Sequence, residues 1–365
     1  MYYRLRYLSL ATATLLLAVT SPVLPVISHL QPVVAQGQWR QEQEPESEKW
    51  SLEVYQLWLK GEYPAALQKL QQDLVTFRKQ GDRARVGAVL SSMGMVYRSM
   101  GQYSQALDYS GQALAILREV GKLPNSDRSI SRTWEGRTLY NIGWVYLYLG
   151  QYPQALEYSQ QALSILREVG DRLWEGRTLN CIGGIYHSLG QYPKALEFYQ
   201  QSLAIMKEIS NRTDEAIALT SIGLVYSNLG QYPKALEFYQ QALAISKAIG
   251  DKAIEAAILT SIGLVYNHLG EYPKALEFYQ QALAIQKDIG GKAGEGTTLN
   301  NIGLIYNYLG QYPKALEFYQ QALAILREIG ARDTEGTTLS NLGLTPRTTK
   351  AARVSRCFLQ TIRQC

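Results

Sequence analysis

The tripeptide Gly-Gln-Tyr or Gly-Glu-Tyr recurs along the 365-residue chain, and this repeat limits the possible folds more than any other feature. Its glycines are Gly61, Gly101, Gly150, Gly190, Gly230, Gly270 and Gly310. Successive copies are 40 residues apart, except for one step of 49, whose extra residues fall in a loop-like segment around Gly121–Ser131. A fixed period of this length indicates an array of one supersecondary unit. The sequence therefore predicts seven units over residues 47–344, with an eighth that begins near Glu335 and stops.

The stretch around Gly230 shows what is repeated. Residues 215–229 carry apolar side chains at helical spacing, and Gly230 supplies the left-handed position that ends a helix. Pro233 suits the first turn of a second helix, which again has one apolar face and ends at Gly250. Each unit is therefore predicted to be a helix–turn–helix hairpin.

A glycine inside the first helix is also repeated. Gly223 costs about 1 kcal/mol relative to Ala at such a position. Its equivalents are Gly143, Gly183, Gly263 and Gly303. We expect a close approach of the second helix at Ala235 and Ala242 to offset this cost, with Tyr226 and Tyr239 filling the space between neighbouring hairpins. Three tyrosines in most units explain why the chain has 26 Tyr and only 6 Phe.

The spacing of Ile222-Gly223, Tyr226, Gly230, Tyr232, Ala235, Tyr239 and Ala242 resembles the tetratricopeptide repeat (TPR). The usual unit has 34 residues, whereas these have 40, similar to the repeats of kinesin light chains and Pins-type spindle adaptors. Large secreted bacterial proteins, many of them cyanobacterial, are also similar, and in some of them the array precedes a caspase-like CHAT domain. The first unit departs from the pattern, with Glu53-Val54 in place of the apolar-Gly pair, as a terminal cap would.

The resemblance implies an all-α solenoid, a right-handed superhelix whose concave groove is lined by the first helix of each unit. In Pins-type relatives, Arg and Asn on that helix contact an extended peptide. The matching positions here are Arg137, Asn141, Arg177 and Asn301. Further candidates on first helices are Asn180, Asn267, His268, Asn300 and Asn307. The alternative for each single residue is an ordinary solvated surface side chain.

Two departures change the expected ligand. The position after the internal Gly, Asn in many relatives, is Trp144, Leu224, Leu264 or Leu304 here. Ser221 and Ser261 occupy the Asn position in two units. We therefore expect a hydrophobic or mixed peptide rather than an acidic one.

Catalytic, metal-binding and cofactor sites are not expected. The three histidines, His29, His187 and His268, and the three cysteines form no ligand spacing and no CxxC. Cys181 fits a small buried position in a helix. A glutamate recurs near the start of each first helix, for which complementation of the helix dipole is the expected role. These glutamates are Glu135, Glu175, Glu215, Glu255, Glu295 and Glu335.

The net charge of +5 comes from the two ends of the chain. Residues 1–35 carry two basic residues and no acid, and residues 345–365 carry five basic residues and no acid. Removing these seven from 36 leaves 29 basic residues against 31 acidic ones, so the array has a net charge of −2, which argues against a nucleic-acid partner.

The N-terminal segment predicts export. Arg4 and Arg6 precede the apolar run Leu8–Val19, which is too short for a confident membrane span, and Ala35 offers a cleavage position. Residues 1–35 are thus interpreted as a signal peptide for a periplasmic or secreted protein, and residues 36–46 as a polar linker. The alternative is an uncleaved anchor, the one case in which the chain would contact a membrane.

Residues 345–365 match no half of the repeat and leave the array in mid-helix. One hypothesis is a frameshift in a longer gene; the rival is a genuine basic tail that binds an anionic surface. The leading functional prediction is a non-enzymatic scaffold that binds a protein or peptide in its groove. The alternative is the sensor half of a truncated TPR–CHAT protein.

Overall fold

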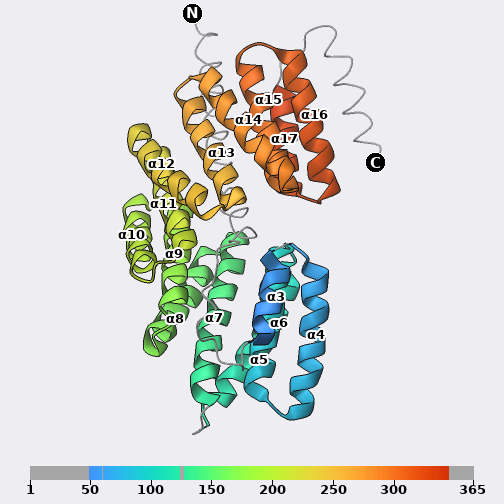
Figure 1. Ribbon diagram of the computed structural model, residues 1–365, viewed down its shortest axis with the longest axis vertical. Helices are drawn as coiled ribbons and strands as arrows, with labels where there is room; N and C mark the ends of the chain where they lie inside the picture. Colours follow the sequence, from blue (N-terminus) through green and yellow to red (C-terminus); the bar gives the residue numbers. More distant parts are fainter. Residues whose placement is uncertain (1–48, 60, 124–126, 345–365) are drawn as a thin grey trace, which may run out of the picture. The chain divides into compact units, whose positions relative to one another are not determined.

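The computed structural model describes residues 49–59, 61–123 and 127–344. The expected signal peptide, linker and basic tail lie outside these residues. The described helices divide into an N-terminal part, residues 49–251, and a C-terminal part, residues 252–344 (Figure 1). Each part is described by itself.

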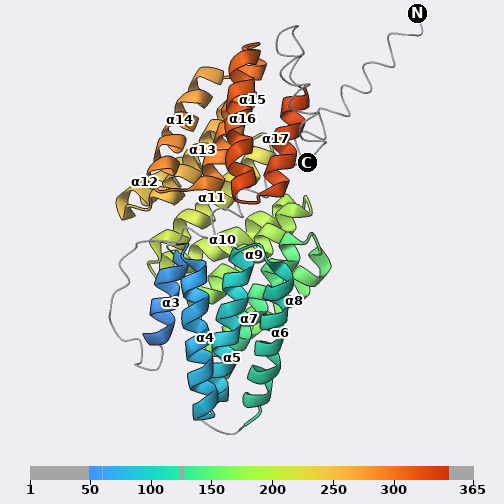
Figure 2. The same cartoon turned by 90° about the vertical axis from the view of Figure 1, so that its right-hand side faces the viewer.

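Helical hairpins build both parts (Figure 2). The first helices are α3 (Lys49–Leu59), α5 (Arg83–Ser99), α7 (Asp127–Tyr148), α9 (Arg172–Ser188), α11 (Arg212–Asn228), α13 (Lys252–His268), α15 (Lys292–Tyr308) and α17 (Arg332–Leu344). The second helices are α4 (Tyr63–Gln80), α6 (Tyr103–Val120), α8 (Tyr152–Val169), α10 (Tyr192–Glu208), α12 (Tyr232–Ile249), α14 (Tyr272–Asp288) and α16 (Tyr312–Glu328). Over the described ranges the fold is all-α, with seven hairpins and the first helix of an eighth, as predicted.

The hairpin turns follow from glycine and proline chemistry. The glycines between first and second helices, such as Gly230 with φ of 70°, adopt the left-handed conformation that only Gly reaches without strain. Proline occupies the first turn of most second helices, where its missing N–H leaves no hydrogen bond unmade. Several first helices begin with an Asp or Asn cap; the Asp171 side chain, for example, accepts from the backbone N–H of Trp174 at 3.2 Å.

The longest first helix corrects one expectation. The extra residues around Gly121–Ser131 were expected to form a loop, but α7 begins at Asp127 and has 22 residues, against 17 in α9. Part of the insertion therefore extends the first helix of the third unit, and Ser131 is fully buried in it.

The glycine inside each first helix makes room for a tyrosine. A Cβ added to Gly223 would meet the Tyr239 ring at 2.7 Å and the Ala235 carbonyl oxygen at 3.2 Å, so the expected close approach at Ala235 is confirmed. The tyrosine prediction is confirmed for Tyr226. Its ring stacks on Phe238 of its own hairpin, with 5.4 Å between ring centroids, and packs against the cluster that contains Ala195 and Tyr199 of the preceding hairpin.

Candidate peptide-binding face

Successive first helices touch through polar side chains at matching registers. The Nδ2 of Asn228 on α11 lies 2.7 Å from Nε2 of His187 on α9, and Trp58 Nε1 on α3 donates to Ser99 Oγ on α5 at 2.8 Å. In the C-terminal part, Asn341 on α17 donates to Asn300 on α15. Within each part, we call the strip of side chains along which successive first helices meet the first-helix face. The residues proposed above as peptide contacts all lie on these first helices.

Two arginines of this face are held in place by aspartates and tryptophans. Arg137 forms an ion pair with Asp171 at 2.9 Å, and its guanidinium lies 5.1 and 5.4 Å from the ring centroids of Trp134 and Trp174. Because stacking and pairing fix the guanidinium, Arg137 is preorganised, and its charge is already neutralised.

Arg177 repeats this arrangement one unit later. It pairs with Asp214 at 2.9 Å and lies over Trp174 at 5.0 Å. The Arg177 side chain is 14% exposed and also donates to the Tyr55 hydroxyl of α3. The first helix of the first unit therefore reaches the first-helix face of the fourth.

The two asparagines of the N-terminal part have an unused acceptor. Asn141 is 3% exposed and Asn180 is half-buried, and the Oδ1 atom of each is buried with no hydrogen-bond partner among the described residues. Since a buried amide oxygen without a partner costs about 1–3 kcal/mol, both positions favour a ligand that donates.

The candidates of the C-terminal part are partly tied to one another. Asn300 donates to Asn301 at 3.4 Å and accepts from Asn341 at 3.0 Å, so these amides form one cluster. Asn307 is half-buried, and its Oδ1 has no hydrogen-bond partner among the described residues. Asn267 is also half-buried. His268 beside it is exposed, and partial desolvation of its imidazole lowers the pKa of that group.

Sequence reasoning missed Arg98 on this face. It lies three residues before the hairpin glycine, the position that His187, Asn267 and Asn307 occupy in later units, and it is 5% exposed. That shared position is the signal that could have found it. Trp144, singled out only as a departure from the family pattern, is 2% exposed with its Nε1 unpartnered among the described residues.

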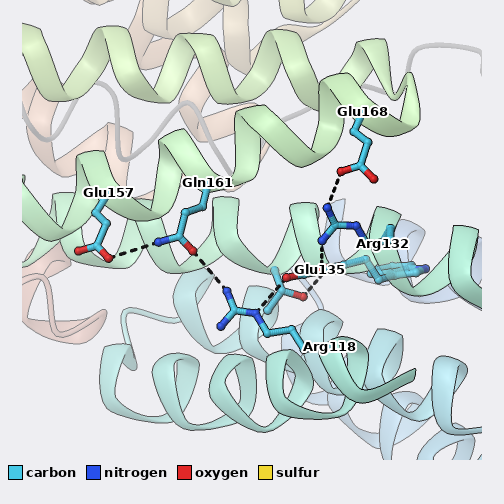
Figure 3. A network of polar contacts seen from close by, with 8 residues as sticks. Arg118, Arg132, Glu135, Glu157, Gln161 and Glu168 are labelled. Carbon is cyan, nitrogen blue, oxygen red and sulfur yellow. Dashed lines mark hydrogen bonds and ion pairs between the residues drawn. The ribbon is translucent and has the colours of Figure 1, made fainter. Parts of the chain in front are cut away.

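The recurrent glutamates form ion pairs in addition to lying near the helix starts, where several occupy the first turn. Glu135 is 4% exposed and accepts from Arg118 Nε of α6 and from Arg132 Nη1 of its own helix α7, at 2.9 and 2.7 Å. Figure 3 shows two further links of this network. Arg132 also donates to Glu168, and Arg118 also donates to Gln161, which in turn donates to Glu157. Glu135, Glu175 and Glu335 thus join consecutive units through an arginine of the preceding second helix, whereas Glu215, Glu255 and Glu295 pair with a basic residue of their own helix.

The remaining features of the described helices are their metal-ligating groups, their titratable groups and their hydropathy. No group of three or more His, Cys, Asp or Glu side chains is placed there to hold a metal ion. Burial raises the pKa of the Cys181 thiol to about 12 and lowers the pKa of His187 to about 4. None of the described helices is long and apolar enough to cross a membrane.

Comparison with known proteins points to one family. The sequence model described as Tetratricopeptide repeat matches residues 174–248, 214–288, 254–328 and 294–361, which together are just over half of the chain. The Trs120/TRAPPC9 N-terminal domain model matches residues 78–186. No curated protein matches.

Similar solved structures share the fold. RapI in its apo form is 17% identical, with a TM-score of 0.59 over 79% of this chain and 100% of that one. A Rap protein complexed with Competence and Sporulation Factor is 19% identical, with a TM-score of 0.59 over 78% and 75%. Aspartyl phosphate phosphatase F from Bacillus subtilis is 17% identical, with a TM-score of 0.54 over 89% and 86%. With the repeat spacing, the hairpins and the family match, the chain belongs to the tetratricopeptide repeat family.

Proposed function

We propose that the chain is a non-enzymatic scaffold whose first-helix face binds an extended segment of a partner protein. The observation that carries this proposal is the pair of buried, unpartnered amide oxygens of Asn141 and Asn180 on consecutive first helices. An extended peptide exposes backbone N–H groups at regular intervals, and these would satisfy both acceptors.

The surroundings of the asparagines support this proposal. Arg137 and Arg177 are fixed by their aspartates and Trp174, so they border the site without large loss of side-chain entropy on binding. A second stretch, in the C-terminal part, consists of Asn267, His268, Asn300, Asn301 and Asn307. Among the structural neighbours, one Rap protein was solved complexed with Competence and Sporulation Factor, so a related fold holds another molecule.

The test is a peptide selection on the purified full chain. A phage library of random peptides is panned against the chain, and the selected peptides are measured against the double variant N141A/N180A. Two lost hydrogen bonds should weaken binding roughly tenfold or more. Gln241→Ala, at an exposed position on α12, is the matched control and should bind as the parent does. Selected peptides that bind the double variant equally well would refute the proposal.

We also propose that the chain is exported. Support comes from Arg4, Arg6 and the apolar run Leu8–Val19. Cell fractionation with N-terminal sequencing tests this: a periplasmic or secreted product that begins near Gln36 agrees, an intact N-terminus in the membrane fraction favours the anchor, and a cytoplasmic product contradicts export.

A further inference from the structure

Arg98 is a buried cation with no carboxylate partner among the described residues. The residue is 5% exposed, and its Nη1 has no hydrogen-bond partner within the ranges that the structure describes. Arg137 and Arg177, on the same face, each pair with an aspartate. An arginine cannot shed its proton to escape burial, so an unpaired guanidinium inside the protein is unfavourable until an anion reaches it.

The neighbours of Arg98 are aromatic or weakly polar. Its guanidinium lies 5.7 Å from the ring centroid of Tyr140. Its charge also acts on Tyr63, Tyr148 and Cys181, where it opposes the rise in pKa that burial causes. No acid is among these contacts, and low-dielectric surroundings strengthen whatever ion pair a ligand forms there.

A second unused donor borders the same rings. The Trp144 indole packs against Tyr140 and Tyr148, with centroid distances of 6.4 and 5.5 Å, and its Nε1 is buried without a partner in the described chain. Trp Nε1 and Arg Nη1 can only donate. Two donors and one uncompensated positive charge therefore call for a ligand that accepts hydrogen bonds and carries one negative charge.

We propose that Arg98, assisted by Trp144, binds a carboxylate of the peptide that occupies the first-helix face. This inference rests on the proposed function and specifies its ligand. A planar carboxylate matches the guanidinium fork, and its single charge balances Arg98, whereas a phosphate dianion would leave an excess negative charge beside tyrosines. A peptide with one carboxylate among apolar residues is the mixed ligand that the sequence suggests.

Residues of the first unit lie near this site. Trp58 donates to Ser99, the residue after Arg98, and Tyr63 lies within the field of the guanidinium. Since Arg98 is 5% exposed, the side chains around its guanidinium must shift when the carboxylate binds.

The test compares three labelled peptide pools by fluorescence polarisation on the full chain. All have randomised uncharged residues and acetylated N-termini; one has a central Glu and an amidated C-terminus, one a central Gln and an amidated C-terminus, and one a central Gln and a free C-terminal carboxylate. The parent should bind a carboxylate pool about tenfold more tightly than the uncharged pool. The pool that binds more tightly than the uncharged pool shows whether the recognised carboxylate belongs to a side chain or to the C-terminus of the peptide.

Arg98→Met should abolish this preference, and Arg83→Met should keep it, because Arg83 is an exposed arginine of the same helix. Arg98→Lys should keep a reduced preference, which covers the case that the Met variant does not fold. Equal binding of all pools by the parent, or an unchanged preference in Arg98→Met, overturns the carboxylate site and leaves the scaffold proposal standing. No binding of any pool would overturn both.

A stability measurement separates recognition from a structural role. Arg98→Met removes an unpaired buried charge, so its urea midpoint should equal or exceed that of the parent while the carboxylate preference disappears. A clearly lower midpoint would show that Arg98 has a structural partner and would overturn the proposal.

Discussion

Two adjacent glycines in α9 should respond oppositely to the same substitution. A Cβ added to Gly183 would lie 2.6 Å from the Tyr199 ring. Added to Gly184, it would have only ordinary contacts, at 3.6 Å from Leu147 and 3.7 Å from the Tyr199 hydroxyl. The two positions share one helix and one neighbouring tyrosine, so each variant is the control for the other.

The magnitudes follow from helix propensity and packing. Replacing Gly by Ala inside a helix gains about 1 kcal/mol. At Gly184 this gain should be nearly complete, because nothing must move. At Gly183 the Tyr199 ring is 1% exposed and packed against Ile222 and Val225 of the next hairpin, so it cannot yield easily. Overpacking of this kind costs about 1–3 kcal/mol, which leaves a net loss of up to about 2 kcal/mol.

Urea unfolding followed by far-UV circular dichroism measures both variants. Because repeat arrays can unfold in stages, hydrogen exchange of α9 should be recorded as a local readout. We expect Gly184→Ala to unfold at higher urea and Gly183→Ala at lower urea than the parent. Midpoints that move in the same direction would refute the explanation of the repeated glycine as room for a tyrosine ring.

Three further predictions concern buried titratable groups. Glu175→Gln should lower the free energy of unfolding by about 2 kcal/mol, because Glu175 is 5% exposed and accepts from Arg167 and Arg172; Glu208→Gln, on an exposed partner of Arg172, should change it little, and equal effects in urea titrations would contradict the network. The pKa of His187 is about 4 in the folded chain and about 6.5 in the unfolded chain. The neutral imidazole therefore leaves the full free energy of unfolding intact above pH 6.5, and this free energy falls by about 3 kcal/mol as the pH falls to 4. Unfolding midpoints at pH 7 and 4.5 should therefore differ less for His187→Asn than for the parent, and an identical difference would refute this. Native Cys181 should resist iodoacetamide at pH 8 and react after unfolding, by peptide mass spectrometry; labelling in the native chain would contradict its burial.

The turns and hairpins were predictable because their signals are local. Gly230 and Pro233 fix the backbone between α11 and α12 through their own conformational limits, and the same pair recurs in other units. The internal Gly223 could likewise be recognised as a close approach, although the sequence could not show that Tyr239 of the same hairpin fills it.

The side-chain partners were less predictable because they come from neighbouring units. The Glu135–Arg132 pair within α7 is local, but Glu135 joins two units because Arg118 at the end of α6 reaches it. Part of the insertion is helical in α7, and Ser131 is buried there in the assembled array, which the local sequence does not indicate. Arg98 is distinguished by the absence of an acid among its described neighbours in the folded array, and the order of residues in the sequence does not reveal these neighbours.

The central claim is that the first-helix face binds a peptide through amide oxygens that the free chain leaves unpaired. A crystal structure of the full chain with the tightest selected peptide tests it most directly. We predict backbone N–H groups of the peptide at about 2.7–3.2 Å from Oδ1 of Asn141 and of Asn180. A peptide bound elsewhere, or one that leaves both oxygens without a donor, would contradict the claim.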